Sequence, residues 1–136
     1  MKQIIPVVAA CIIDQRKGIL LHRKIEARNP ELLGKWEFPG GMMEYGEDPY
    51  IALRREIREE LSREIYIRRL IHAQTNIYED GKHYLVLFYE CIMDGDPIID
   101  GCQWFSPEEI KSLDVLPGTK EVVDLLAEIS LQSGGK

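Results

Sequence analysis

The chain has 136 residues, a formal net charge of −6 and a hydrophobic content of 45%, which is ordinary for one globular domain with its own core. The acidic balance argues against a nucleic-acid polymer as partner, because binding to phosphate backbones favours a basic surface. No apolar run reaches the ~20 residues of a membrane-spanning helix, and residues 1–6 lack the pattern of a secretory signal. We therefore expect one cytoplasmic domain over residues 1–131, without membrane contact, and a disordered tail at 132–136.

The N-terminal third predicts a hairpin followed by a loop. Residues 3–13 and 19–24 are rich in Ile, Val and Leu, and the polar segment 14–18 between them is typical of a turn. Residues 25–34 lose this periodicity and predict a mobile loop. An extended segment returns at residues 35–38, where Trp36 and Phe38 alternate with polar residues and should face the same side. We expect both aromatic side chains to pack in the core.

The next stretch predicts a capped helix over residues 48–62. Asp48 is a favourable N-cap and Pro49 a favourable first helical residue. Leu, Ala, Arg and Glu, all good helix formers, fill the following positions. Before the helix lie Gly40 and Gly41, which we expect to form a glycine-rich loop, and an acidic residue at Glu47.

Three carboxylates share one face of this predicted helix. At about 100° per residue, Glu59 and Glu60 project within about 60° of Glu56. A helix laced with surface salt bridges is the simplest alternative, but such a helix mixes opposite charges on one face. In this chain Glu56 repels both neighbours, and a divalent cation such as Mg²⁺ would turn that repulsion into coordination. Arg55 borders the acidic face beside Glu59.

The C-terminal half predicts further strands and two helices. Residues 65–79 and 83–92 read as strands joined by a turn, and residues 103–105 as a short strand. Ser106 and Pro107 begin a short helix, and residues 118–131 form an amphipathic helix. His72 and His83 stand alone in the sequence and are typical of structural histidines. Strands that alternate with helices in this order predict an α/β fold in which helices cover both faces of a mixed sheet.

The segment from Gly41 to Glu60 resembles the signature of the Nudix hydrolase (MutT-like) family. The resemblance rests on Gly41, then Glu47, then the run Arg-Glu-Ile-Arg-Glu-Glu at residues 55–60, with family spacing throughout. The family pattern ends in glycine and an aliphatic residue, whereas this chain has Ser62 and Arg63. Because a glycine would cap the helix, its loss predicts a helix that runs a few residues further. The resemblance implies the Nudix fold, an α/β/α sandwich with a mixed β-sheet.

The resemblance also implies a metal site on the acidic face of the helix. Glu56, Glu59 and Glu60 would bind Mg²⁺, or Mn²⁺, and a backbone carbonyl of Gly40 or Gly41 would join them. In such enzymes the metal neutralises phosphate oxygens and lowers the pKa of an attacking water.

Catalytic roles follow from the same pattern. One carboxylate should act as general base, and Glu56 and Glu59 are the candidates. Glu47 supports the site, and Arg55 orients the ligand carboxylates as a hydrogen-bonding partner.

Four residues outside the helix are candidates for substrate binding by position. Arg23 is either a solvent-facing edge residue or, as in MutT-like relatives, a ligand of the substrate phosphates. Phe38 would lie near the nucleotide base. Asp100 precedes the strand 103–105, where relatives often place an extra acidic ligand or base. Thr119 takes the place of a base-reading asparagine, and a hydroxyl cannot offer the paired donor and acceptor of an amide.

The function implied is hydrolysis of a diphosphate linkage in a small nucleotide. We expect a nucleoside triphosphate as substrate, cleaved to a monophosphate and pyrophosphate. ADP-ribose, nucleotide sugars and dinucleotide polyphosphates are the alternative substrates. A nucleotide-binding regulatory module without hydrolysis, or a plain structural domain, are the alternative functions. The base and the oligomeric state, monomer or homodimer, stay open.

Overall fold

The computed structural model describes residues 2–25, 30–97 and 99–133. Its elements, in chain order, are β1 (Ile4–Asp14), β2 (Gly18–Arg23), the 3-10 turn η1 (Pro30–Leu32), β3 (Trp36–Glu37), β4 (Gly40–Met42), α1 (Pro49–Leu61), β5 (Ile65–Ile77), β6 (His83–Met93), β7 (Cys102–Phe105), α2 (Pro107–Lys111) and α3 (Thr119–Ser133). Within these ranges no helix is long and apolar enough to cross a membrane. Residues 26–29 of the expected loop and 134–136 of the expected tail lie outside the described residues.

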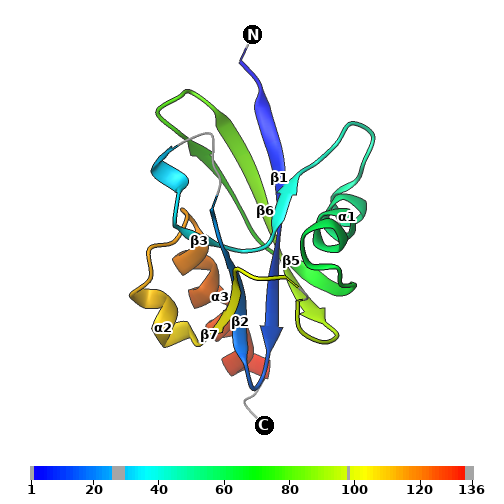
Figure 1. Ribbon diagram of the computed structural model, residues 1–136, viewed down its shortest axis with the longest axis vertical. Coiled ribbons are helices and arrows are strands. Elements are labelled where there is room, and N and C mark those ends of the chain that lie inside the picture. Colours follow the sequence, from blue (N-terminus) through cyan, green and yellow to red (C-terminus); the bar gives the residue numbers. More distant parts are fainter. Residues whose placement is uncertain (1, 26–29, 98, 134–136) are drawn as a thin grey trace.

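The strands form a mixed sheet in the order β3-β2-β1-β6-β5, with β4 paired to β1 and β7 paired to β2. β1 and β6 run parallel from the pair Ile4–His83 to the pair Ile12–Cys91. The other pairings between named strands are antiparallel. Figure 1 shows α1 on one side of the sheet and α2 and α3 on the other. The expected α/β/α sandwich with a mixed sheet is therefore confirmed.

Two apolar layers hold the helices to the sheet. α1 buries Leu53, Ile57 and Leu61 completely, and these side chains share a cluster with the inner residues of β1 and β6. On the opposite face α3 contributes Val122 and Leu126 to a second cluster. Burial of such side chains is the main force that stabilises a domain of this size. The apolar edge of α1 thus fixes the direction of its acidic face.

The ends of α1 follow the sequence closely at one terminus and depart from it at the other. The side chain of Asp48 accepts a hydrogen bond from the backbone N–H of Ile51 at 2.9 Å, as expected of an N-cap. The helix ends at Leu61, so the expected extension is wrong. Ser62 itself takes the left-handed conformation, with φ 54° and ψ 39°, and donates its N–H to the carbonyl of Arg58 at 3.0 Å. A non-glycine residue in this conformation costs about 1 kcal/mol, which the fold tolerates.

The segment Gly40–Met42 is a strand, β4, so the expectation of a glycine-rich loop at these residues is wrong. Gly40 pairs with Ala9, and Gly41 with Val8. A Cβ atom at Gly40 would overlap the carbonyl group of Val8. The glycines therefore permit a close approach of two backbones, which a sequence pattern of small residues cannot distinguish from a flexible loop.

Candidate functional site

Arg55, in the middle of α1, donates hydrogen bonds to three carboxylates, and its Nη1 lies 3.6 Å from a fourth, that of Glu44. Its Nε donates to Glu47 at 2.6 Å and its Nη2 to the other oxygen of the same carboxylate at 2.9 Å. Its Nη1 donates to Glu56 at 3.0 Å and to Glu59 at 3.3 Å. Its Nη2 also donates to the carbonyl of Met42 at 3.1 Å. We call Glu47, Glu56 and Glu59 around Arg55 the carboxylate cluster. The arginine reaches further than its helical position beside Glu59 predicted.

The carboxylates of the cluster differ in their surroundings and therefore in how readily they bind a proton. The paired hydrogen bonds from Arg55 lower the pKa of Glu47 to about 2. Burial raises the pKa of Glu56, although Arg55 opposes the effect. The side chain of Glu59 is 60% exposed and reaches solvent. One acid is thus held firmly ionised, while another is closer to accepting a proton.

Glu60 lies apart from the cluster, under β4. Its carboxylate accepts a hydrogen bond from the backbone N–H of Gly40 at 3.0 Å. Burial raises the pKa of Glu60 to about 7, and the negative charges of Glu37 and Glu56 add to the shift. Among the described residues, the positive charge of Lys24 offsets this shift only in part.

Gly41 leaves room for the carboxylate of Glu56. A Cβ atom at this position would collide with all three atoms of that carboxylate group. The glycine expected to approach a ligand thus already allows close contact between β4 and α1. Any larger residue would have to displace Glu56.

The donor chemistry of this region fits a hard divalent cation. Glu56, Glu59 and Glu60 offer carboxylate oxygens, the ligands that Mg²⁺ prefers. Burial raises the pKa values of Glu56 and Glu60, so a bound cation would stabilise their ionised forms. In the described part of the chain, no three His, Cys, Asp or Glu side chains are already gathered on one point as a metal site. The three expected ligands share a region of α1, with Glu56 held by Arg55 and Glu60 by Gly40.

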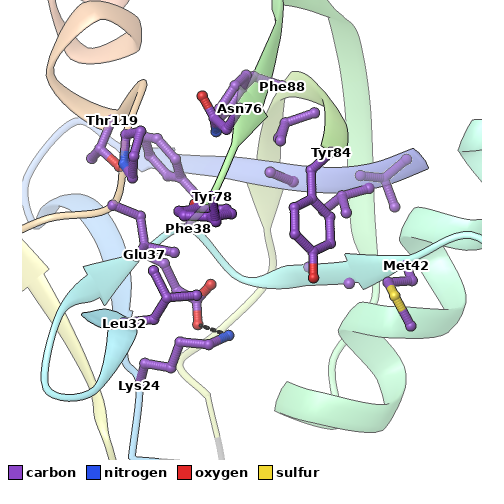
Figure 2. A pocket seen from close by; sticks show the side chains of 18 of the residues that line it. Lys24, Leu32, Glu37, Phe38, Met42, Asn76, Tyr78, Tyr84, Phe88 and Thr119 are labelled. Carbon is purple, nitrogen blue, oxygen red and sulfur yellow. Dashed lines mark hydrogen bonds and ion pairs between the residues drawn. The ribbon is translucent and has the colours of Figure 1, made fainter. Parts of the chain in front are cut away.

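A cavity of about 370 Å³ opens next to Glu60 and β4. Figure 2 shows Asn76 and Thr119 at the top of the view, Lys24 at the bottom and Met42 at the right. Its remaining lining residues come from β1, η1, the β3–β4 segment, α1, the β5–β6 hairpin and the turn before α3. They are Val7, Val8, Ala9, Leu32, Glu37, Phe38, Gly40, Gly41, Glu60, Tyr78, Asp80, Lys82, Tyr84, Val86, Phe88, Leu116 and Pro117. The cavity therefore joins the acidic face of α1 to a wall built by both ends of the chain.

The four expected substrate residues divide by position. Phe38 and Thr119 line the cavity, and Phe38 also packs edge to face against Phe88 with ring centroids 5.9 Å apart. Arg23 lies outside the lining, where its Nε donates to the carbonyl of Gly34 at 3.4 Å. Asp100 is exposed and also lies outside the lining. The substrate roles of all four stay predictions.

Several cavity residues escaped the sequence interpretation. Lys24 and Glu37 form an ion pair of 3.2 Å at the bottom of Figure 2. Asn76, Tyr78 and Tyr84 come from the β5–β6 hairpin, where the two tyrosine rings stand edge to face with centroids 5.7 Å apart. The available signal was the recurrence of polar residues at every second position near the end of β5. That signal needs the orientation of the strand before it can be used.

Comparison with known sequences gives one family and a group of related enzymes. Residues 4–126 match the NUDIX domain family. The chain is 26% identical over 130 residues to the nucleoside triphosphatase NudI of Escherichia coli O139:H28 (strain E24377A / ETEC), covering 85% of this chain and 92% of that protein. The protein of the same name from Shigella flexneri serotype 5b (strain 8401) matches over the same length with the same identity.

Solved structures give the same fold. The solution structure of the E. coli ORF135 protein superposes with a TM-score of 0.77 at 26% identity, covering 98% of this chain and 94% of that chain. The MutT NUDIX hydrolase from Burkholderia pseudomallei has a TM-score of 0.77 at 25% identity, covering 91% and 98%. The C. elegans Ap4A hydrolase shares the fold with a TM-score of 0.73 at 19% identity, covering 93% and 98%.

Proposed function

This chain belongs to the Nudix hydrolase family, and we propose that it hydrolyses nucleoside triphosphates to nucleoside monophosphates and pyrophosphate with the help of Mg²⁺ or Mn²⁺. The family membership confirms the expected enzyme class, a Nudix pyrophosphohydrolase. The choice of nucleoside triphosphates is supported by the similarity to proteins named nucleoside triphosphatase NudI, which extends over most of both chains. The expected cytoplasmic location stays a prediction.

The observation that carries the proposal is the continuity of the cavity with the acidic face of α1. Glu60 and Gly41 line one part of the cavity, and Phe38, Tyr84 and Thr119 line other parts. A volume of about 370 Å³ lies within the range of small-molecule sites. Aromatic rings suit a nucleobase, whereas phosphates require compensation of their negative charge. A nucleotide offers both chemistries in one molecule.

The residues expected to hold the cation are Glu56, Glu59 and Glu60, together with the backbone of Gly40 or Gly41. When bound, the cation supplies positive charge for the phosphate oxygens and acidifies a water molecule. Arg55 holds the carboxylates of this region in place, because it joins the pre-helix segment to the helix. The general base is one of two carboxylates, Glu56 or Glu59, which receives a proton from the attacking water.

The test is a substrate screen with purified protein and Mg²⁺. Nucleoside triphosphates, nucleotide sugars, ADP-ribose and dinucleotide polyphosphates are compared by product analysis. We expect monophosphate and pyrophosphate from the triphosphates, and loss of this activity in Glu59→Gln. Turnover of ADP-ribose without turnover of any triphosphate would overturn the substrate. Nucleotide binding without turnover of any compound would indicate a regulatory module.

A further inference from the structure

The inward face of β5 near the cavity is polar, whereas its outward face is partly apolar. In the segment 72–77 the half-buried positions carry His72, Gln74 and Asn76. Ile77, which points the other way, is 70% exposed. A half-buried strand normally shows the opposite arrangement, with apolar residues inward. Of these three residues Asn76 lines the cavity, and a few polar groups in the wall of a cavity fix the orientation of a bound ligand.

The three inward side chains form a directional chain of hydrogen bonds. His72 Nε2 lies 2.9 Å from Gln74 Oε1, and Gln74 Nε2 donates to Asn76 Oδ1 at 2.8 Å. With Oε1 of Gln74 facing His72, the imidazole tautomer that carries hydrogen on Nε2 donates to it. Each link fixes the orientation of the next amide, so the chain ends with the carbonyl of Asn76 occupied. We call His72, Gln74 and Asn76 the amide ladder.

Neighbouring groups hold the ladder in place. A Cβ atom at Gly118 would lie 2.8 Å from the amide atoms of Gln74, so this side chain is closely packed against the turn that precedes α3. The ring of His72 packs beside Phe88, with centroids 5.8 Å apart and planes at 34°. A hydrogen-bonding group whose orientation is fixed in advance discriminates better than a mobile one.

The free end of the ladder is the amide nitrogen of Asn76. Asn76 lines the cavity together with Thr119, and Figure 2 shows both at the same end of the view. Within the described residues, the hydrogen bonds to its side chain involve only the carbonyl oxygen. The amide N–H groups are therefore presented as donors to whatever occupies the cavity.

We propose that the amide ladder reads the edge of the nucleobase and selects bases that present a carbonyl oxygen there, such as uracil or hypoxanthine, over bases that present an exocyclic amine. This inference rests on the proposed function, because it takes the occupant to be a nucleotide. An amine placed against the Asn76 amide brings two donors together and leaves both unpaired. We expect discrimination on the order of 10–100-fold, since an unpaired buried polar group is costly.

The most informative variant changes Gln74, which lies behind Asn76, the residue that contacts the base in this proposal. In Gln74→Glu the new carboxylate only accepts, so it takes a hydrogen bond from His72 and another from the amide of Asn76. The Asn76 side chain then turns its carbonyl oxygen into the cavity. The preference should therefore reverse toward bases with an exocyclic amine. Gln74 is a positioning residue, because it acts on the base only through Asn76. A merely structural role of Gln74 would weaken all nucleotides alike.

Two further variants make the test independent of folding and of added charge. Asn76→Asp places a fixed acceptor at the end of the ladder and should produce the same reversal. Thr75→Glu adds the same negative charge on the exposed face of the strand and should leave the preference unchanged. Thermal denaturation of each variant checks that it is folded.

The measurement compares two nucleotides at a time, chosen so that their bases match in size. Calorimetry compares the α,β-methylene triphosphates of uridine with cytidine and of inosine with adenosine, and kcat/KM is measured for the corresponding triphosphates. The expected result is a preference for uridine and inosine in the native protein, reversed in Gln74→Glu and Asn76→Asp. Equal binding within both pairs in the native protein would overturn the inference, as would an unchanged preference in both ladder variants.

The two readouts separate this inference from the proposed function. If the analogues bind with the expected preference and no triphosphate is hydrolysed, the ladder is supported and the proposed reaction fails. If triphosphates are hydrolysed with equal kcat/KM within each pair, the reaction stands and the ladder is overturned. If no analogue binds and no triphosphate is hydrolysed, both are overturned.

Discussion

The carboxylate cluster and the amide ladder are both polar networks carried by regular elements, but they differ in charge and direction. The cluster places several anions around one cation, Arg55. Nearby Glu60 has a pKa raised by burial, which among the described residues Lys24 offsets only in part. The ladder is neutral, and each of its hydrogen bonds has a fixed sense. Excess negative charge attracts a cation, and a cation held there would attract phosphates whatever base is attached to them. Directed neutral groups distinguish one base from another, because only the correct partner satisfies them.

The largest effect is expected at the cluster. Glu59→Gln removes a candidate base and metal ligand, and should lower kcat by about 10²–10⁴-fold. Because the role we propose for the cluster concerns the phosphates, the loss should be equal for every nucleoside triphosphate. Glu64→Gln is the control, since Glu64 is 67% exposed and pairs with Arg58 outside the site. A loss that differs strongly among bases would contradict the separation of the two networks.

A smaller loss is expected at the centre of the cluster. Arg55→Lys keeps one positive charge but cannot donate to Glu47 with two nitrogens and also reach Glu56. Activity should fall about 10–100-fold, because the ligand carboxylates lose their orientation. Initial rates as a function of Mg²⁺ concentration measure the change, and a weaker metal affinity should accompany it. Arg58→Lys, on the exposed side of α1, should have little effect.

Glu60 provides a pH-dependent test of the unbalanced charge. Its pKa in the folded protein is raised from 4.5 to about 7, so the folded state binds the extra proton. Without metal, the free energy of unfolding should fall as pH rises from about 4.5 to about 7, by at most about 3 kcal/mol from this group. Urea unfolding across this window measures the slope, and Glu60→Gln should flatten it. An identical slope in the variant would refute the assignment.

Metal addition should reverse the sign of this effect. Mg²⁺ competes with the proton for the carboxylate of Glu60, so its binding strengthens as pH rises through about 7. The stabilisation by saturating Mg²⁺ should therefore be greater at pH 8 than at pH 6. Melting temperatures measured with and without Mg²⁺ at both values test this expectation. Equal shifts would mean that Glu60 does not take part in metal binding.

The smallest effect is expected at the cavity wall. Thr119→Val preserves shape and removes a hydroxyl from a residue that is 1% exposed and lines the cavity. The loss of one neutral hydrogen bond to a ligand should lower kcat/KM about 2–10-fold. This change should depend on the base, unlike the change caused by Glu59→Gln. Thr75→Val, on the outward face of β5, is the matched control and should leave the base preference unchanged.

The features that the sequence predicted well are set by local chain geometry. The start of α1 follows from Asp48 and Pro49, because capping depends on residues next to each other. The shared face of Glu56, Glu59 and Glu60 follows from the helical repeat alone. The acidic region could therefore be placed before its surroundings were known.

The features that it missed depend on contacts between distant segments. Gly40 and Gly41 form a strand only because β1 offers an open edge for pairing. The reach of Arg55 to Glu47 depends on how the pre-helix segment folds back. The position of Asn76 in the cavity wall depends on which way β5 faces, and its partner Gln74 lies against the turn before α3. Local periodicity contains none of these distances, so the cavity wall could not be derived from it.

Ser62 has a consequence for how the family signature is used to find other members. The signature combines ligand-contacting positions, whose side chains act on the ligand, with backbone positions, which only need a certain backbone angle. Ser62 takes the left-handed conformation required at the backbone position that ends α1, although it is not glycine. The cost is about 1 kcal/mol, which other contacts can offset. A search that gives backbone positions and ligand-contacting positions equal weight will miss active chains in which a backbone position is substituted. Weighting the carboxylates above the terminal glycine should recover them.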